Sequence, residues 1–221
     1  YAQVKILHVL RPAEPSAPFP AEYGEVRVVR KAIGYKKIKF YTQENLGWGD
    51  ILLPEDTYHT QSTWFTVPPA VLEALELPQS DLLDALHGIA HLVHGLASLL
   101  LMCDGRDLGV VLGDRSREWF SRPARADGPE PHATPPDRFE PTIFLYDQYS
   151  GGIGLAEALH PRVGELLAGA RDRLAACPCA TGCPSCVGPE GQVGPKAKAH
   201  ATRLLAALVT SMAERPAAAG A

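Results

Sequence analysis

The sequence predicts an α+β fold with N-terminal antiparallel strands, two or three long helices, a short strand pair and a four-cysteine zinc knuckle. Three observations lead to this prediction. Apolar and polar residues alternate in much of the first third of the chain, which is typical of half-buried strands. Apolar residues recur every three or four positions between residues 82 and 100, which is typical of a long helix. Four of the five cysteines fall within ten consecutive residues, 177–186.

The composition sets limits on the function. The chain has 221 residues, of which 46% are hydrophobic, so it can bury a core and wholesale disorder is excluded. The 21 lysines and arginines against 25 aspartates and glutamates give a formal net charge of −4 (21 − 25), so any nucleic-acid-binding surface has to be a local patch. The sequence contains no G-x-x-x-x-G-K-[ST] phosphate loop, so we expect this chain alone not to hydrolyse a nucleotide by that route.

The first third is predicted to be rich in strands. Residues 3–10 form the first predicted strand. Between residues 25 and 42, apolar residues alternate with basic ones and Gly34 interrupts the run, which predicts two strands joined at a tight turn. Residues 45–48 are predicted to form a further turn and residues 61–67 a short strand.

The middle of the chain predicts helices. Two prolines at 68–69 start a short helix that reaches about residue 77. Ser80 is expected to cap a long helix that begins at Asp81 and ends near residue 103. The uncharged residues 85–103 include three histidines, which indicates a buried amphipathic helix rather than a membrane span.

The second half predicts a strand pair at residues 108–112 and 142–146, a helix over residues 155–175 and a last helix from Pro195 to about residue 213. Six prolines between the two strands of this pair predict a loop insertion. The expected organisation is a β-rich connecting segment with a basic hairpin at residues 1–78, a helical zinc-binding domain at 79–216 with the insertion at 122–141, and a frayed tail at 217–221.

The cysteine cluster is the clearest chemical signal. Its spacing is C-x-C-x3-C-x2-C over Cys177, Cys179, Cys183 and Cys186. Four thiolates can hold a tetrahedral Zn²⁺ and leave no open position, so the metal would be structural. A disulfide pair, an iron–sulfur cluster and the absence of any metal are the alternatives. Cys103 stands apart and is expected to be a buried apolar residue rather than a fifth ligand.

A local basic ribbon is predicted to bind nucleic acid. Six lysines and arginines lie between residues 27 and 39 with no acidic residue among them, and aromatic residues are interleaved. Cations can follow phosphates while aromatic rings stack on bases. The alternative is a solvated edge strand protected by lysines. The candidate nucleic-acid-binding residues are Arg27, Arg30, Lys31, Tyr35, Lys36, Lys37 and Lys39.

A glycine-rich turn and three histidines are weaker indications of a functional site than the cysteine cluster. The strand ending at Asp147 is followed by Gly151, Gly152 and Gly154 before a helix start, which suits either a tight turn or an anion site at backbone N–H groups. His87, His91 and His94 share one helix face, and we expect them to be satisfied, partly buried histidines rather than metal ligands.

Five motifs occur in a characteristic order: LHGIAH at 86–91, MCDGRDLG at 102–109, FLYD at 144–147, GGIG at 151–154 and CPCATGCPSC at 177–186. This order resembles the C-terminal zinc-binding domain of MrfA-type superfamily II DNA repair helicases. GYKKIK at 34–39 and TQSTW at 60–64 resemble the segment that precedes this domain. The resemblance spans about residues 25–208, and the stretch 122–141 is an insertion relative to the family pattern.

The resemblance implies a parent enzyme that hydrolyses ATP with Mg²⁺, moves 3′→5′ along single-stranded DNA and takes part in the repair of damage such as crosslinks. It also implies zinc on the four clustered cysteines and a role in holding the single strand beside motor lobes in cis. We expect a monomer without membrane association in the bacterial cytoplasm, at the nucleoid. This chain itself is expected to lack ATPase and helicase activity.

Two other functions stay open on the sequence. One is a purely structural brace for the motor lobes with little direct DNA contact. The other is a metal-dependent nuclease that uses Asp104, Asp107 and Asp147, because acidic clusters can hold two Mg²⁺ ions. Each of these aspartates can equally be a turn or cap residue.

Overall fold

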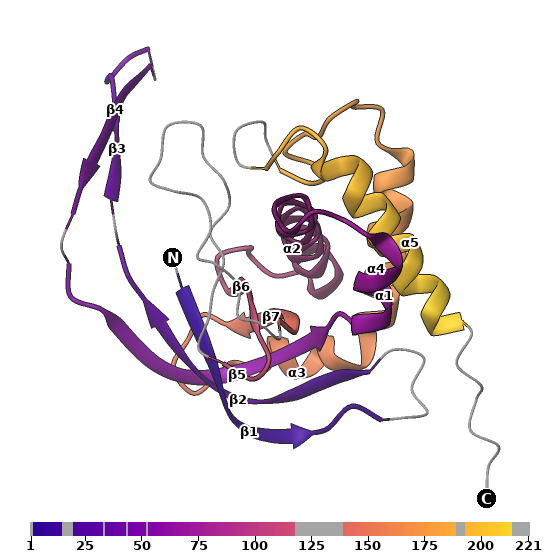
Figure 1. Cartoon of the computed structure of the whole chain (residues 1–221). Coiled ribbons are helices and arrows are strands. Elements are labelled where there is room, and N and C mark those ends of the chain that lie inside the picture. The colour runs from indigo at the N-terminus through magenta and orange to yellow at the C-terminus, as the bar shows by residue number, and fades with distance from the viewer. Residues whose placement is uncertain are drawn as a thin grey trace, which may run out of the picture.

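The computed structural model describes residues 2–14, 20–32, 34–42, 44–51, 53–117, 139–188 and 193–213. Its centre is a five-stranded antiparallel sheet that helices cover on one face, which confirms the predicted α+β class (Figure 1). The sheet order is β1 (Ala2–Arg11), β2 (Ala21–Arg30), β5 (Asp56–Thr66), β7 (Pro141–Asp147) and β6 (Leu108–Asp114). The predicted insertion at 122–141, apart from its last three residues, and the tail at 217–221 lie outside the described residues.

Strand β5 connects the two halves of the chain. It pairs with β2 from Ala21↔Phe65 to Arg30↔Asp56, and its last residues pair with β7 on the other side. The segments before and after residue 78, where the sequence predicts a boundary, therefore contribute to one sheet.

The sheet buries side chains on both faces, following the two-residue period of strands. Phe65, Ile143 and Leu145 point into the main core, which the helices complete. Trp64 and Phe144, their neighbours in sequence, belong to a second, smaller core on the opposite face. The edge strands β1 and β6 contact each other, so the curled sheet encloses this second core itself.

The helices of the main core are α1 (Pro69–Leu75), α2 (Gln79–Leu101), α3 (Leu155–Leu159), the 3₁₀ turn η1 (His160–Arg162), α4 (Val163–Ala176) and α5 (Ala197–Ala213). Helix α2 is central and packs against α4, α5 and β6 (Figure 1). Among the described helices it alone has the length and apolarity to cross a membrane, but half of its most apolar window is buried against the rest of the fold. This burial agrees with the predicted core helix.

Three local predictions are wrong in their details. Pro78, not Ser80, precedes the first turn of α2, because the Pro78 carbonyl accepts the Leu82 N–H at 2.9 Å. The helix predicted over 155–175 is divided into α3, η1 and α4 around Pro161, since proline has no N–H to donate. Residues 45–48 form part of a strand, β4 (Asn45–Asp50), rather than a turn.

The predicted hairpin between two strands of residues 25–42 is also wrong. Strand β2 has β1 on one edge and β5 on the other, so it has no edge left for the next strand. Strand β3 (Gly34–Ile38) pairs instead with β4 in a separate two-stranded sheet. This pair with its connecting turn, which we call the β3–β4 arm, projects away from the sheet and helices (Figure 1, upper left).

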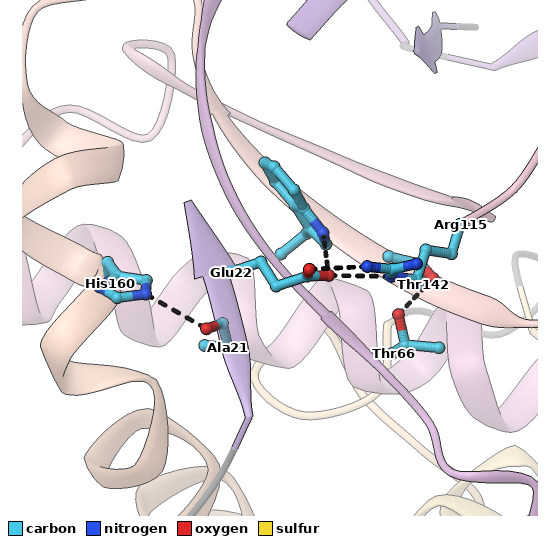
Figure 2. Close-up of polar contacts among 7 residues, drawn as sticks. Ala21, Glu22, Thr66, Arg115, Thr142 and His160 are labelled. Atoms are coloured by element: carbon cyan, nitrogen blue, oxygen red, sulfur yellow. Dashed lines mark hydrogen bonds and ion pairs between the residues drawn. The ribbon is translucent and has the colours of Figure 1, made fainter. Parts of the chain in front are cut away.

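A buried carboxylate ties the sheet together in a way the sequence does not reveal. Glu22 on β2 accepts hydrogen bonds from Trp64 Nε1 at 2.8 Å and from Arg115 Nε and Nη2 at 2.9 and 2.7 Å (Figure 2). Burial alone would raise the pKa of Glu22, but the hydrogen bonds from Arg115 and Trp64 outweigh it and lower the pKa below its usual value. Glu22 is therefore held as a paired anion between three segments of the sheet.

Candidate metal site and basic arm

The four clustered cysteines converge on one point. Neighbouring Sγ atoms lie 3.5 to 3.6 Å apart around the ring Cys177, Cys179, Cys186 and Cys183, and all four lie within 4.8 Å of one another. Four sulfurs at about 2.3 Å from a tetrahedral Zn²⁺ would be about 3.8 Å apart. The spacing therefore fits a zinc ion held by four thiolates.

The segment that carries them, residues 177–187, is the zinc knuckle. It follows the end of α4 at Ala176 and turns back on itself at Cys183, whose carbonyl accepts the N–H groups of Cys186 at 2.9 Å and Gly188 at 3.1 Å. Gly182 makes the turn possible with φ +146°, and a Cβ there would lie 2.7 Å from Val187 Cγ2.

Side chains from three helices fix the knuckle from outside. His91 Nε2 of α2 donates to the Pro184 carbonyl at 2.7 Å, and Arg173 Nε of α4 donates to the Ser185 carbonyl at 3.4 Å. Lys198 Nζ of α5 donates to the carbonyls of Cys177, at 2.8 Å, and Cys179. Four thiolates around Zn²⁺ carry a net charge of −2, so the Lys198 ammonium also lies where it offsets that charge.

Helix α2 approaches the knuckle closely at a glycine. A Cβ on Gly88 would lie 2.8 Å from the Cβ of Val187, which is buried in the main core. Sequence reasoning missed Gly88 and Lys198 as supports of this site. Only the position of His91 on the apolar helix could have suggested its role.

The thiols differ in their intrinsic acidity. Hydrogen bonds, first from the Cys179 backbone and then from the Cys179 side chain, lower the pKa of Cys177 to about 7. Burial raises the pKa of Cys186 to about 12. A bound cation is what would allow all four to be thiolates at neutral pH.

The comparisons with known proteins agree with this geometry. A family model described as the MrfA Zn-binding domain matches residues 89–187, which include all four cysteines. This chain contains an MrfA zinc-binding domain. The match begins within α2 and ends at the last residue of the zinc knuckle.

Relatives extend the likeness beyond this domain. The Bacillus subtilis ATP-dependent helicase YprA is 34% identical over 203 residues, which is 92% of this chain and 24% of YprA. The Saccharomyces cerevisiae ATP-dependent helicase HRQ1 is 19% identical over 187 residues, 84% of this chain and 16% of HRQ1. A crystal structure of the DUF1998 helicase MrfA bound to DNA aligns with a TM-score of 0.61 and 32% identity over 94% of this chain and 24% of that one. The chain thus spans about a quarter or less of each of these three proteins.

The predicted basic residues fall into two groups. Arg27 and Arg30 lie on β2, and Lys31 follows that strand, whereas Tyr35, Lys36, Lys37 and Lys39 lie on the β3–β4 arm or directly after β3. The two groups do not lie on paired strands of one hairpin, so the predicted basic ribbon is divided between β2 and β3.

The first group already has partners in the chain. Arg30 Nε donates to Asp56 Oδ2 at 3.0 Å, and the Arg30 guanidinium lies 4.8 Å from the Tyr58 ring centroid. Lys31 Nζ lies 2.9 Å from Glu55 Oε1. Exposed pairs of this kind contribute about 0–1 kcal/mol, so a phosphate could compete for these cations.

The arm presents two aromatic residues near its tip to solvent. Phe40 is 81% exposed and Tyr41 is 92% exposed, beyond the end of β3. Lys37 Nζ lies 5.9 Å from the Tyr35 ring centroid, and Lys39 Nζ lies 3.6 Å from Glu44 Oε2. The arm therefore combines flat apolar surface with cations, a combination suited to single-stranded nucleic acid.

The glycine-rich turn is filled by the chain's own carboxylate. Buried Asp147 accepts the N–H groups of Ile153, Gly154 and Ala156 at 2.6 to 2.8 Å, at the start of α3. These are the donors that an external anion would need. Gly151, Gly152 and Gly154 each have φ between +80° and +87°, so the turn alternative accounts for them.

The remaining candidates have structural partners. His94 Nε2 donates to the carbonyl of Leu108 at 2.8 Å. Asp104 accepts the Arg106 N–H at 2.8 Å, and Asp107 accepts the Tyr149 hydroxyl at 2.8 Å. Within the described ranges the four cysteines are the only cluster of three or more His, Cys, Asp or Glu side chains that could hold a metal, so the aspartates of the nuclease hypothesis do not converge.

Proposed function

We propose that this chain is the accessory C-terminal region of an ATP-dependent 3′→5′ DNA repair helicase, and that it holds single-stranded DNA beside the motor lobes. The observation that carries the proposal is the four-sulfur cluster inside an MrfA zinc-binding domain, aligned over 92% of the chain with a helicase. ATP and Mg²⁺ would be used by the parent's motor lobes and not by this chain. The zinc would be structural, because four protein ligands leave no position for a substrate.

The β3–β4 arm is the proposed DNA contact. It lies outside both cores, carries lysines and projects from the body of the protein (Figure 1). The DNA-bound MrfA structure supports a DNA role for proteins of this shape. We further propose a monomer that acts in the bacterial cytoplasm.

A salt titration tests the proposal. The zinc-loaded chain is titrated with labelled oligo-dT at several salt concentrations, and we expect the affinity to fall steeply as salt rises, because phosphate contacts release counterions. Lys37→Gln with Lys39→Gln should weaken binding and reduce the slope against log salt by roughly 1 to 2, about 0.7 for each lost phosphate contact. The absence of binding by a folded, zinc-loaded chain would contradict a DNA-holding role for this region alone.

A purely structural brace is the second candidate, and one observation favours it. Leu99 and Met102, at the end of α2, are 75% and 93% exposed. Leu99 also lines a groove of about 500 Å³ between α2, Arg173 and the zinc knuckle. Exposed apolar surface beside a groove is typical of a protein contact. Capture of the parent's motor lobes without DNA, lost in Leu99→Gln, would favour this function.

A further inference from the structure

No packing role within the described structure explains the outermost aromatic residues of the β3–β4 arm. Tyr35 does have one, because a Cβ on Gly49 of the opposite strand would lie 2.5 Å from the Tyr35 ring, so this ring covers the glycine. Phe40 and Tyr41 lie beyond the paired strands, where the Lys39 N–H donates to the Glu44 carbonyl at 2.9 Å and closes the turn. Adjacent exposed apolar side chains form a contiguous patch, and such patches can mark a binding surface.

The two rings contact each other but leave their faces open. Their centroids are 5.0 Å apart and their planes meet at 85°, in an edge-to-face arrangement. A base stacks parallel to the ring that it contacts. Rings at nearly a right angle cannot both lie parallel to one base, so each has to serve a different base.

The charges around the rings favour nucleic acid over an apolar protein surface. Lys37 and Lys39 precede the two rings within four residues, and the acidic residue of the same turn, Glu44, has its Oε2 3.6 Å from Lys39 Nζ. The aliphatic side chains of the arm, Ile38 and Leu46, are less exposed than Phe40 and Tyr41. The outermost surface is therefore aromatic, with Lys37 and the Lys39–Glu44 ion pair beside it.

We infer that Phe40 and Tyr41 stack on unpaired bases of single-stranded DNA while Lys37 and Lys39 contact the neighbouring phosphates. This inference rests on the proposed function and assigns base contact to two residues outside the predicted nucleic-acid-binding set. Contact through base faces is tolerant of sequence, because every base has a π-face.

The test compares two oligonucleotides with the same number of phosphates, an oligo-dT and an oligonucleotide of abasic sites. The double variant Phe40→Leu, Tyr41→Leu keeps apolar side chains but removes the rings. We expect it to bind oligo-dT roughly tenfold more weakly than the wild type, with little change for the abasic strand. Lys37→Gln with Lys39→Gln should weaken binding to both strands alike, and Leu46→Ala, an apolar truncation on the same arm, should change neither.

The outcomes separate this inference from the proposed function. If the wild type binds neither strand, both fail. If the wild type binds and the lysine variant weakens both strands, but the ring variant binds oligo-dT as tightly as the wild type, base stacking alone is refuted and the tip instead suits a protein partner. Equal losses on both strands in the ring variant would also refute stacking.

A second measurement needs no variant. 2-Aminopurine placed in the oligonucleotide is quenched when it stacks, so the wild-type chain should lower its fluorescence on binding. Binding without any change in fluorescence, at every position of the probe, would overturn the inference.

Discussion

The zinc knuckle and the β3–β4 arm are both short segments with little core of their own, yet they are stabilised in opposite ways. In the knuckle, four sulfurs face one point, and side chains from α2, α4 and α5 bind its backbone. In the arm, two strands pair only with each other, and the aromatic residues at the tip face water. An isolated two-stranded hairpin is marginal in water. The surrounding helices thus hold the knuckle in place, whereas the arm leaves the side chains at its tip exposed.

The largest effect is expected from breaking the knuckle's metal site. Cys183→Ser removes one thiolate, and because the metal replaces a core in this segment, we expect loss of bound zinc and unfolding of residues 177–187. The melting temperature should fall by roughly 10 °C or more, since several kcal/mol are lost and each shifts it by about 2–4 °C in a chain of this size. Zinc analysis and a thermal melt measure this.

Cys103→Ser is the matched control, because Cys103 lies outside the cluster and should leave one equivalent of zinc in place. A Cys183→Ser protein with one zinc and the wild-type melting curve would refute the metal's structural role.

The next effect concerns the contact between α2 and the knuckle. Alanine is a better helix former than glycine by about 0.5–1 kcal/mol, so Gly95→Ala, with nothing within 4 Å of the new Cβ, should stabilise the protein by that amount. Gly88→Ala should instead destabilise it by about 1–3 kcal/mol, because the new Cβ would collide with Val187. Denaturant unfolding of the two variants provides the measurement. Equal stabilisation by both would mean that α2 does not abut the knuckle.

A smaller effect is expected at the lysine that holds the ligands' backbone. Lys198→Met removes two hydrogen bonds and a cation beside the thiolates, which should cost about 1–2 kcal/mol and speed zinc loss to a competing chelator. Lys196→Met, at a side chain that is 71% exposed, serves as the control. Equal rates of zinc loss in the two variants would mean that Lys198 does not support the zinc site.

The smallest effect on stability is expected in the arm. Phe40→Ala with Tyr41→Ala removes two exposed rings that contribute to neither core, so unfolding should change by no more than about 0.5 kcal/mol and zinc content should not change. Thermal melts with zinc analysis test this. A loss comparable to that of Gly88→Ala would show that the tip packs against the body, and the contrast between the two segments would be wrong.

The sequence by itself determined the parts of this protein that depend on local spacing. The period of apolar residues determined α2, and four cysteines within ten residues determined the zinc site, because ligands so near in the chain can converge without help from distant segments. The sequence likewise predicted β1, β6 and β7 to within two residues at each end.

Only the tertiary structure decided what those parts contact. The sequence predicts β2 to be half of a hairpin, but β1 and β5 occupy its two edges. The sequence leaves a turn and an anion site open at Asp147, and the structure decides for the turn because the Asp147 carboxylate accepts the N–H groups at the start of α3. Lys198 and Gly88 gain their roles only where α5 and α2 reach the knuckle. The physical reason is that the partners of strand edges, buried carboxylates and closely packed helices lie far away in the chain. No local sequence pattern specifies which distant group becomes the partner.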